Sequence, residues 1–223
     1  MNDFRPGWSD IDILVLTDHE ITPEEAGALL PLRRTLHEKE PENPNYRLFE
    51  GGMLSKSAFL SKSPCRVVYW GTSGERIADH YAFDSFSTAQ LLKSGVLLKG
   101  TDIKSAIAPP TEEELHADIR RHLKTIRDYA HLTKNSLYIF GWMLDSARCL
   151  YTFRTNGIIS KTEAGEWALR QGLCPDPDAL SCALKIRKQP FLIKTDPNLI
   201  GCAENMLFPI QRFADVLERE INK

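Results

Sequence analysis

Two aspartates open a strongly apolar stretch near the start of the chain. Asp10 and Asp12 lead the segment "DIDILVLT" at residues 10–17. Side chains two apart on an extended strand point to the same side and lie about 6.5 to 7 Å apart, so these two carboxylates repel each other. Mg²⁺ relieves such repulsion, because it takes one or two protein carboxylates and completes its shell with water and phosphate oxygens. The spacing indicates a candidate magnesium site, and a solvated strand end is the alternative interpretation.

A third acidic residue, Glu50, is a candidate general base. A pair of metal-binding carboxylates generally works with an acidic group from a neighbouring strand, which orients or deprotonates the attacking hydroxyl. Glu50 lies in "NYRLFEGGML", where Gly51 and Gly52 leave room for a substrate to approach the backbone. The alternative is a glutamate that faces solvent before a bulge.

Composition excludes several classes of protein. A net charge of −2 and a pI near 6.3 give no electrostatic footprint for binding nucleic acid. The five cysteines are odd in number and scattered, which fits neither a disulfide framework nor a zinc site and suggests a reduced, cytoplasmic setting. No stretch approaches the roughly 18 consecutive apolar residues of a membrane helix, and the N-terminus lacks the apolar core of a signal peptide, so we expect no membrane partner.

The residue pattern changes near Pro109 and Pro110. Before them, strand-like runs alternate with loops and brief helices, with strands expected at 10–16, 46–54 and 66–70 and a helix at 22–39. After them, almost every segment has helical periodicity, with helices expected at 111–129, 134–153, 160–170, 178–188 and 203–221. The chain is therefore expected to form two domains, residues 1–108 and residues 109–223.

Local signals place several of these helix ends. Thr111 with Glu114, and Ser160 with Glu163, form capping boxes that begin two helices. Asn156-Gly157 ends the long helix between them. The last helix carries an apolar stripe of Met206, Ile210, Phe213 and Leu217.

Motifs in both halves resemble one family. "WSDIDILVLTD" at 8–18 resembles the S-D-x-D strand of the nucleotidyltransferase superfamily, and "CLYTFRTNGIISKTEAGEWAL" at 149–169 resembles the C-terminal domain of the streptomycin and spectinomycin adenylyltransferases. The stretch "LLKSGVLLKGTDIKSAIAPPTEEEL" at 91–115 is similar to that family's inter-domain passage. The resemblance covers residues 7 to about 188.

The resemblance implies a fold and an activity. The fold would be α+β, with an N-terminal nucleotidyltransferase-like mixed sheet flanked by helices, followed by an all-α helical bundle. The activity would be Mg²⁺-dependent transfer of AMP from ATP to a hydroxyl of a small-molecule acceptor. An aminoglycoside is the candidate acceptor, with antibiotic resistance as the biological role.

The resemblance also implies roles for individual residues in the first half. Asp10 and Asp12 match the family's metal-binding pair, and Ser9 matches a serine that helps bind the phosphates. Glu50 matches the glutamate that acts as general base on the acceptor hydroxyl.

Two basic residues of the second half, Arg148 and Lys161, match residues that reach the triphosphate. Lys161 falls in the first turn of the helix capped by Ser160, where free N–H groups and the helix dipole favour an anion. Arg148 lies in an apolar helix and requires a partner, which is either phosphate or Asp145, three residues earlier.

Two departures separate the chain from the family pattern. The glycine-serine phosphate-binding element expected upstream of the aspartates is missing, as is the strand before it, because only nine residues precede Asp10. The protein is therefore either longer than this chain or a truncated relative. A truncated relative would be a weak or inactive enzyme that binds nucleotide or protein, including a toxin–antitoxin type of element.

The second departure concerns the acceptor. Lys134 stands where the family keeps acidic residues that bind the drug's amino groups, which argues against a polycationic acceptor.

Overall fold

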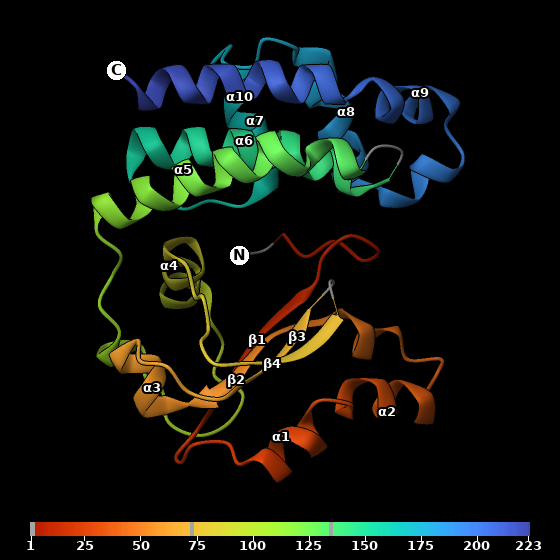
Figure 1. Ribbon diagram of the computed structural model, residues 1–223. Coiled ribbons are helices and arrows are strands. Elements are labelled where there is room, and N and C mark those ends of the chain that lie inside the picture. Colours follow the sequence, from red (N-terminus) through yellow and green to blue (C-terminus); the bar gives the residue numbers. More distant parts are fainter. Residues whose placement is uncertain (1–2, 72–73, 134–135) are drawn as a thin grey trace. The chain divides into compact units, whose positions relative to one another are not determined.

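The chain folds into two compact units. A computed structural model describes residues 3–71, 74–133 and 136–223 (Figure 1). The first unit, here called the α/β unit, comprises Ser9–Phe83 and Ser105–Ile107. The second, the helical unit, comprises Met1–Trp8, Asp84–Lys104 and Ala108–Lys223. This division by packing assigns residues 84–104 to the helical unit, and the predicted domain boundary after residue 108 stays a prediction.

The α/β unit is built on a four-stranded mixed sheet in the order β1-β2-β3-β4 (Figure 1). The strands are β1 (Ile11–Thr17), β2 (Phe49–Ser55), β3 (Val67–Gly71) and β4 (Gly74–Ala78). β1 and β2 run parallel, whereas β2 with β3 and β3 with β4 are antiparallel. The predicted fold class, a mixed sheet followed by an all-helical part, is confirmed.

Because side chains alternate along each strand, the two faces of this sheet carry different residues and pack against different helices. One face packs Met53, Val68 and Trp70 against residues of the segment that holds α1 (Pro23–Leu29). The other face packs Leu54 and Val67 against α3 (Lys56–Ser61) at one end only. The opposite end of that second face carries the predicted acidic residues, so this face is apolar at one end and acidic at the other.

Several boundaries in the α/β unit differ from the prediction. The single helix expected at 22–39 is two helices, α1 and α2 (Leu32–Lys39), because Pro31 lacks the N–H that a continuous helix would need and instead precedes α2. The strand expected at 46–54 begins only at Phe49, after a 3₁₀ turn at Pro44–Leu48. β4 and α3 were not predicted, because both are short and lack clear periodicity.

Seven α-helices of the helical unit lie among the described residues. They are α4 (Ser85–Ser94), α5 (Glu112–Tyr129), α6 (Tyr138–Thr155), α7 (Lys161–Arg170), α8 (Pro177–Lys188), α9 (Pro197–Asn205) and α10 (Leu207–Ile221). Both predicted capping boxes are present, at Thr111 with Glu114 and at Ser160 with Glu163. Asn156 ends α6 in the left-handed conformation, with φ of 54°, as the sequence predicted.

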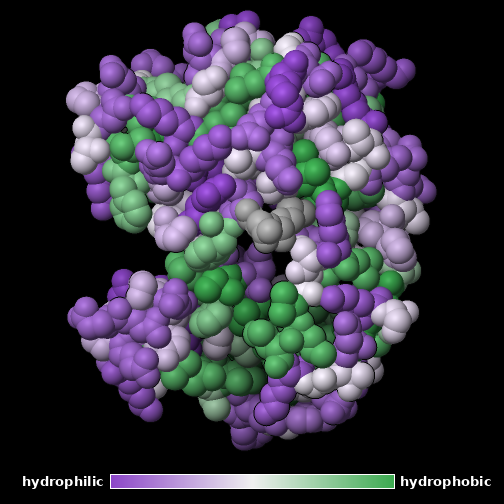
Figure 2. Space-filling view, turned by 180° about the vertical axis from the view of Figure 1, so that it is seen from behind, coloured by the Kyte–Doolittle hydropathy of each residue, from purple (hydrophilic) through white to green (hydrophobic). Residues whose placement is uncertain are grey.

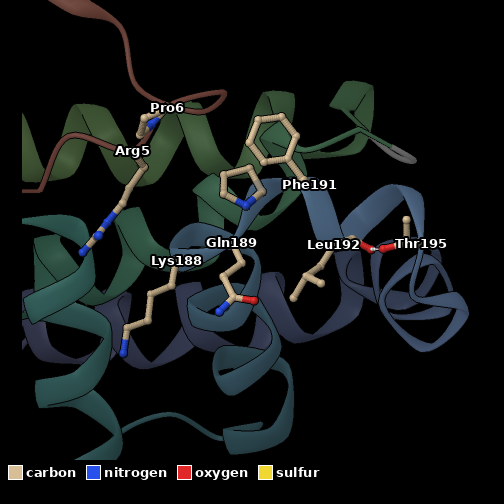
Figure 3. A pocket seen from close by; sticks show the side chains of 8 residues that line it. Arg5, Pro6, Lys188, Gln189, Phe191, Leu192 and Thr195 are labelled. Atoms are coloured by element: carbon tan, nitrogen blue, oxygen red, sulfur yellow. Dashed lines mark hydrogen bonds between the residues drawn. The ribbon is translucent and has the colours of Figure 1, made fainter.

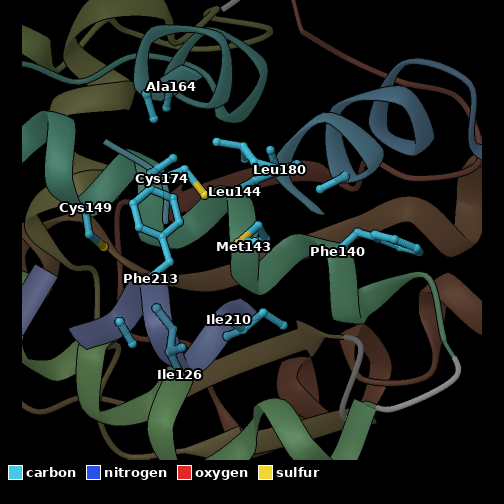
Figure 4. Packing of buried hydrophobic residues seen from close by; sticks show 14 of the residues in the cluster. Ile126, Phe140, Met143, Leu144, Cys149, Ala164, Cys174, Leu180, Ile210 and Phe213 are labelled. Atoms are coloured by element: carbon cyan, nitrogen blue, oxygen red, sulfur yellow. The ribbon is translucent and has the colours of Figure 1, made fainter. Parts of the chain in front are cut away.

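The core of the helical unit forms around α6. Phe140, Met143 and Leu144 of this helix are fully buried and pack with residues of α5, α7, α8 and α10 (Figure 4). The predicted stripe on the last helix is confirmed, because Met206, Ile210, Phe213 and Leu217 are all fully buried. The helix expected from 203 to 221 is divided at Met206, where α9 ends and α10 begins.

Polar side chains cover most of the face of the helical unit that is visible in Figure 2. Among the helices of the described residues, none is both long and apolar enough to cross a membrane.

The pairing of β1 with β2 depends on a glycine, which gives a first prediction. A Cβ on Gly51, whose φ is +148°, would lie 1.8 Å from the carbonyl oxygen of Ile13. Gly51→Ala should therefore lower the free energy of unfolding by about 3 kcal/mol or more, measured by urea titration with circular dichroism. Gly27→Ala is the matched control, because no atom lies within 4 Å of the new Cβ in α1 and the change should stabilise by about 0.5 to 1 kcal/mol. Equal effects of the two substitutions would contradict this account of the β1–β2 contact.

Candidate functional site

The sheet register brings two of the predicted acidic residues together. Asp12 of β1 is the direct partner of Glu50 in the parallel β2. Adjacent strands lie about 4.8 Å apart and in-register side chains share one face, so the two carboxylates are neighbours. Asp10 precedes β1 by one residue and stands two positions before Asp12 on the same side. Three carboxylates separated by up to forty residues in the sequence thus meet at one end of a sheet face.

Tyr69 of β3 was not among the predicted site residues, yet it contacts Glu50. Its Oη donates a hydrogen bond of 2.7 Å to Glu50 Oε1. Burial, the hydrogen bond to Glu50 and the charge of that carboxylate raise the pKa of Tyr69 well above its ordinary value, so the phenol is protonated and acts as the donor at neutral pH. The sequence signal for this contact was weak, because it depends on the β2–β3 register.

Two neighbours hold the Tyr69 ring in place. The ring lies across Gly71, where an added Cβ would come within 2.4 Å of a ring carbon. The guanidinium of Arg76, the partner of Tyr69 on β4, stacks over the ring at 4.1 Å from its centre. Tyr69 and Arg76 therefore form a row of packed side chains next to Glu50 at the polar end of the face.

The space that we expected at Gly51 and Gly52 is filled by the protein itself. The carbonyl of Ile13 occupies the position of a Gly51 side chain, and a Cβ on Gly52 would lie 2.8 Å from the Tyr81 ring. The expectation that these glycines admit a substrate is wrong. They permit close strand pairing and cover by an aromatic ring.

The donor set at the aspartates fits magnesium in type. In the part of the chain that the structure describes, no group of three or more His, Cys, Asp and Glu side chains is arranged to hold a metal ion by itself. Mg²⁺ does not require such a cage, because it keeps several waters and takes the remaining oxygens from a phosphate ligand. Asp10 and Asp12 are both exposed and offer only oxygen atoms, so these two residues would hold the ion.

In the helical unit, the two predicted basic residues meet at one carboxylate. Asp145 of α6 accepts a 3.0 Å hydrogen bond from Lys161 Nζ and lies 3.3 Å from Arg148 Nη2. Burial raises the pKa of Asp145, but the Lys161 and Arg148 charges outweigh it and hold the pKa below the ordinary value. Of the two partners considered for Arg148, the structure shows Asp145.

Two polar atoms in the cluster of Asp145, Arg148 and Lys161 make no hydrogen bond to the described residues. Arg148 Nε and Asp145 Oδ1 are buried and have no hydrogen-bond partner among the described residues. The Arg148 guanidinium also stacks over the Phe86 ring, 5.4 Å from its centre. Two cations share one anion here, so the cluster keeps positive charge that a further anion could balance.

The N-terminus of α7 already holds an anion that the sequence analysis missed. Lys161 is the first residue of this helix, as predicted, and follows the cap Ser160. Asp3 accepts a 2.7 Å hydrogen bond from Thr162 Oγ1 and a 3.4 Å hydrogen bond from the Thr162 N–H. Arg187 Nη2 lies 3.2 Å from the same carboxylate. Because Asp3 and Thr162 are 159 residues apart, no local pattern could reveal this contact.

A hollow in the helical unit does not contain any predicted site residue. It has a volume of about 470 Å³ and lies beside residues 5–6 and 188–195 (Figure 3). Its two cationic side chains are already paired, Arg5 with Asp3 at 3.2 Å and Lys188 with Glu166 at 2.6 Å. We therefore place the candidate site at the acidic residues of the sheet and not in this hollow.

Comparison with known proteins bears on both halves of the chain. Residues 110–186 match the family model of the aminoglycoside adenylyltransferase C-terminal domain. This segment lies within the helical unit and includes Asp145, Arg148 and Lys161. The resemblance drawn from the sequence motifs of this half is confirmed.

A solved structure extends the likeness to the whole fold. It is the crystal structure of spectinomycin adenyltransferase AAD(9) from Enterococcus faecialis with ATP and spectinomycin. The TM-score is 0.62 at 15% sequence identity, over 95% of this chain and 86% of that one. A search of curated proteins finds no match. The two chains therefore share a fold.

The expectation based on Lys134 falls on residues outside those that the structure describes.

The Asp145 cluster predicts a pH dependence of stability. A carboxyl group whose pKa is lower in the folded than in the unfolded protein contributes stability above the unfolded value, and this contribution is lost as the pH falls toward the folded value. The free energy of unfolding of the wild type should therefore fall more steeply between pH 5 and pH 3 than that of Asp145→Asn, by up to about 1.4 kcal/mol per pH unit.

Urea titrations at half-unit pH steps measure the two slopes. At neutral pH the Asn variant should be less stable by about 3 kcal/mol, because two partly buried cations lose their carboxylate. The difference between the two proteins should stay constant from pH 6 to pH 7, which is the internal control. Parallel curves below pH 5 would mean that the Asp145 charge is not linked to folding.

Proposed function

We propose that this protein is a magnesium-dependent adenylyltransferase, which transfers AMP from ATP to a hydroxyl of a small acceptor. The observation that carries the proposal is the register of β1 and β2, which sets Asp12 beside Glu50 on one face of the sheet. Further support comes from the family match of residues 110–186 and from the shared fold with an adenyltransferase whose crystal structure contains ATP and spectinomycin.

The chemistry follows from the roles of these residues. The acceptor oxygen would attack the α-phosphorus of ATP, the bond from that phosphorus to the bridging oxygen would break, and pyrophosphate would leave. Glu50 would take the proton of the acceptor hydroxyl. Mg²⁺ bound by Asp10 and Asp12 would neutralise charge on the phosphates. We further propose Ser9, Arg148 and Lys161 as ligands of those phosphates.

An aminoglycoside or a related antibiotic is the proposed acceptor. The matching family model is that of aminoglycoside adenylyltransferases, and the structure with the shared fold was determined with spectinomycin. A panel that includes spectinomycin and streptomycin, assayed for pyrophosphate release from ATP, tests this choice. Release that depends on one of these compounds, with a product heavier by one AMP moiety in the mass spectrum, is the expected result.

A second candidate is a nucleotide-binding or protein-binding module without turnover. The internal carboxylates favour it, because Asp145 already neutralises part of the charge of Arg148 and Lys161, and Asp3 occupies the N-terminus of α7. The same assays separate the candidates. A nucleotide-binding module would gain thermal stability with Mg²⁺ and ATP, a protein-binding module would not, and neither would release pyrophosphate with any acceptor.

Removal of one aspartate tests the metal site. Asp12→Asn should reduce kcat/KM for AMP transfer by about a thousandfold and abolish the rise in melting temperature that Mg²⁺ with ATP produces, because one oxygen ligand loses its charge. Asp18→Asn is the matched control. Asp18 lies directly after the other end of β1, is largely exposed and pairs with Lys56, so its variant should keep both properties. An unaltered nucleotide-induced shift in Asp12→Asn would count against the assignment.

Neutralising the proposed base tests a different step. Glu50→Gln should bind Mg²⁺ and ATP with a similar dissociation constant but lower kcat by about 10² to 10⁴, because the amide cannot accept the proton. Calorimetric titration with a non-hydrolysable ATP analogue measures binding, and the pyrophosphate assay measures turnover. Full activity in this variant would require another residue as base.

A further inference from the structure

Glu50 is held from one side by a tyrosine that takes no part in the transfer steps above. Tyr69 donates its 2.7 Å hydrogen bond to Oε1 only. Oε2 accepts no hydrogen bond from the residues that the structure describes. The two oxygens of this carboxylate are therefore different, and one of them is already committed to a protein donor.

The tyrosine can impose this difference because it is itself immobilised. Its ring is confined by Gly71 beneath it, by the Arg76 guanidinium at 4.1 Å, and by the Tyr81 ring, whose centre is 6.2 Å away. Such contacts lock a rotamer, so the hydroxyl occupies one position relative to β2. Burial and the Glu50 carboxylate raise the pKa of Tyr69, and the phenol consequently stays a donor throughout the neutral and mildly alkaline range.

A general base benefits from this arrangement in a specific way. A glutamate side chain has three rotatable bonds, and only some of its rotamers present an oxygen to the acceptor hydroxyl. A donor that binds one oxygen removes most of this freedom before the acceptor arrives, and such preorganisation contributes to rate rather than to nucleotide affinity.

We propose that Tyr69 is a positioning residue for AMP transfer, which fixes Oε1 of Glu50 so that Oε2 is the oxygen that accepts the proton of the acceptor hydroxyl. This inference rests on the proposed function, because it assumes that Glu50 is the base. A purely structural role for Tyr69 is the competing explanation. In that case the contribution of Tyr69 comes from the packing of its ring and not from its hydroxyl.

Tyr69→Phe separates the two explanations, because it keeps the ring, its packing and its contact with Arg76 while removing only the hydroxyl. Positioning predicts that kcat falls about 10- to 100-fold while the KM for ATP stays within about twofold. A structural role predicts a lower melting temperature with kcat unchanged in the folded fraction.

The matched control is Tyr46→Phe. Tyr46 belongs to the same unit and donates the same kind of hydrogen bond, 3.1 Å from its Oη to Glu40 Oε2, but it lies in the 3₁₀ turn before β2 and its acceptor is not Glu50. This variant should keep the wild-type kcat and the wild-type KM for ATP. A loss of kcat equal to that of Tyr69→Phe would overturn the assignment of a specific role to Tyr69.

A double-mutant cycle adds a test that does not depend on small changes in folding. If Tyr69 acts through Glu50, then Tyr69→Phe should have no further effect on kcat in a Glu50→Gln background. Additive losses would overturn the proposal. Wild-type transfer that is unaffected by Tyr69→Phe overturns the role of Tyr69 and leaves the proposed function standing. A wild type that releases no pyrophosphate with any acceptor overturns the proposed function itself, and with it the inference about Tyr69.

Discussion

The close parallel pairing of β1 with β2 is the constraint on which the candidate site depends. The two strands approach so closely that the Ile13 carbonyl fills the space of a side chain at Gly51. This approach fixes the register that makes Asp12 and Glu50 partners. A shift of one residue would turn one carboxylate to the opposite face, so the close approach that Gly51 permits keeps Asp12 and Glu50 on the same face.

The sheet face that carries Asp12 and Glu50 has a buried apolar end and a polar end. At one end, Leu54 and Val67 are buried under α3. At the other, Glu50, Tyr69 and Arg76 form a line of contacts across three strands, from a carboxylate to a phenol to a guanidinium. The apolar end contributes buried contacts between the strands, and the register places the polar and charged groups side by side at the other end.

In the helical unit, cations in partly buried positions come with internal anions. Asp145 serves Arg148 and Lys161, and Asp3 serves Arg187 together with the first turn of α7. Burial of an unpaired charge is costly, so these carboxylates are what allow basic residues to stand inside the bundle before any ligand binds. A phosphate ligand of Arg148 or Lys161 would share these cations with Asp145, which limits how strongly either could bind it.

Short-range patterns determined much of this protein. The D-x-D alternation, both capping boxes, the Asn156 helix end and the buried stripe of α10 follow from contacts within a few residues, which propensity and periodicity report directly. The proposed acidic residues could also be named from the sequence. The pairing of Asp12 with Glu50, the hydrogen bond from Tyr69, the ion pair of Lys161 with Asp145 and the contact of Asp3 with Thr162 were decided only by the tertiary structure, because strand register and helix packing bring together residues that no local pattern relates.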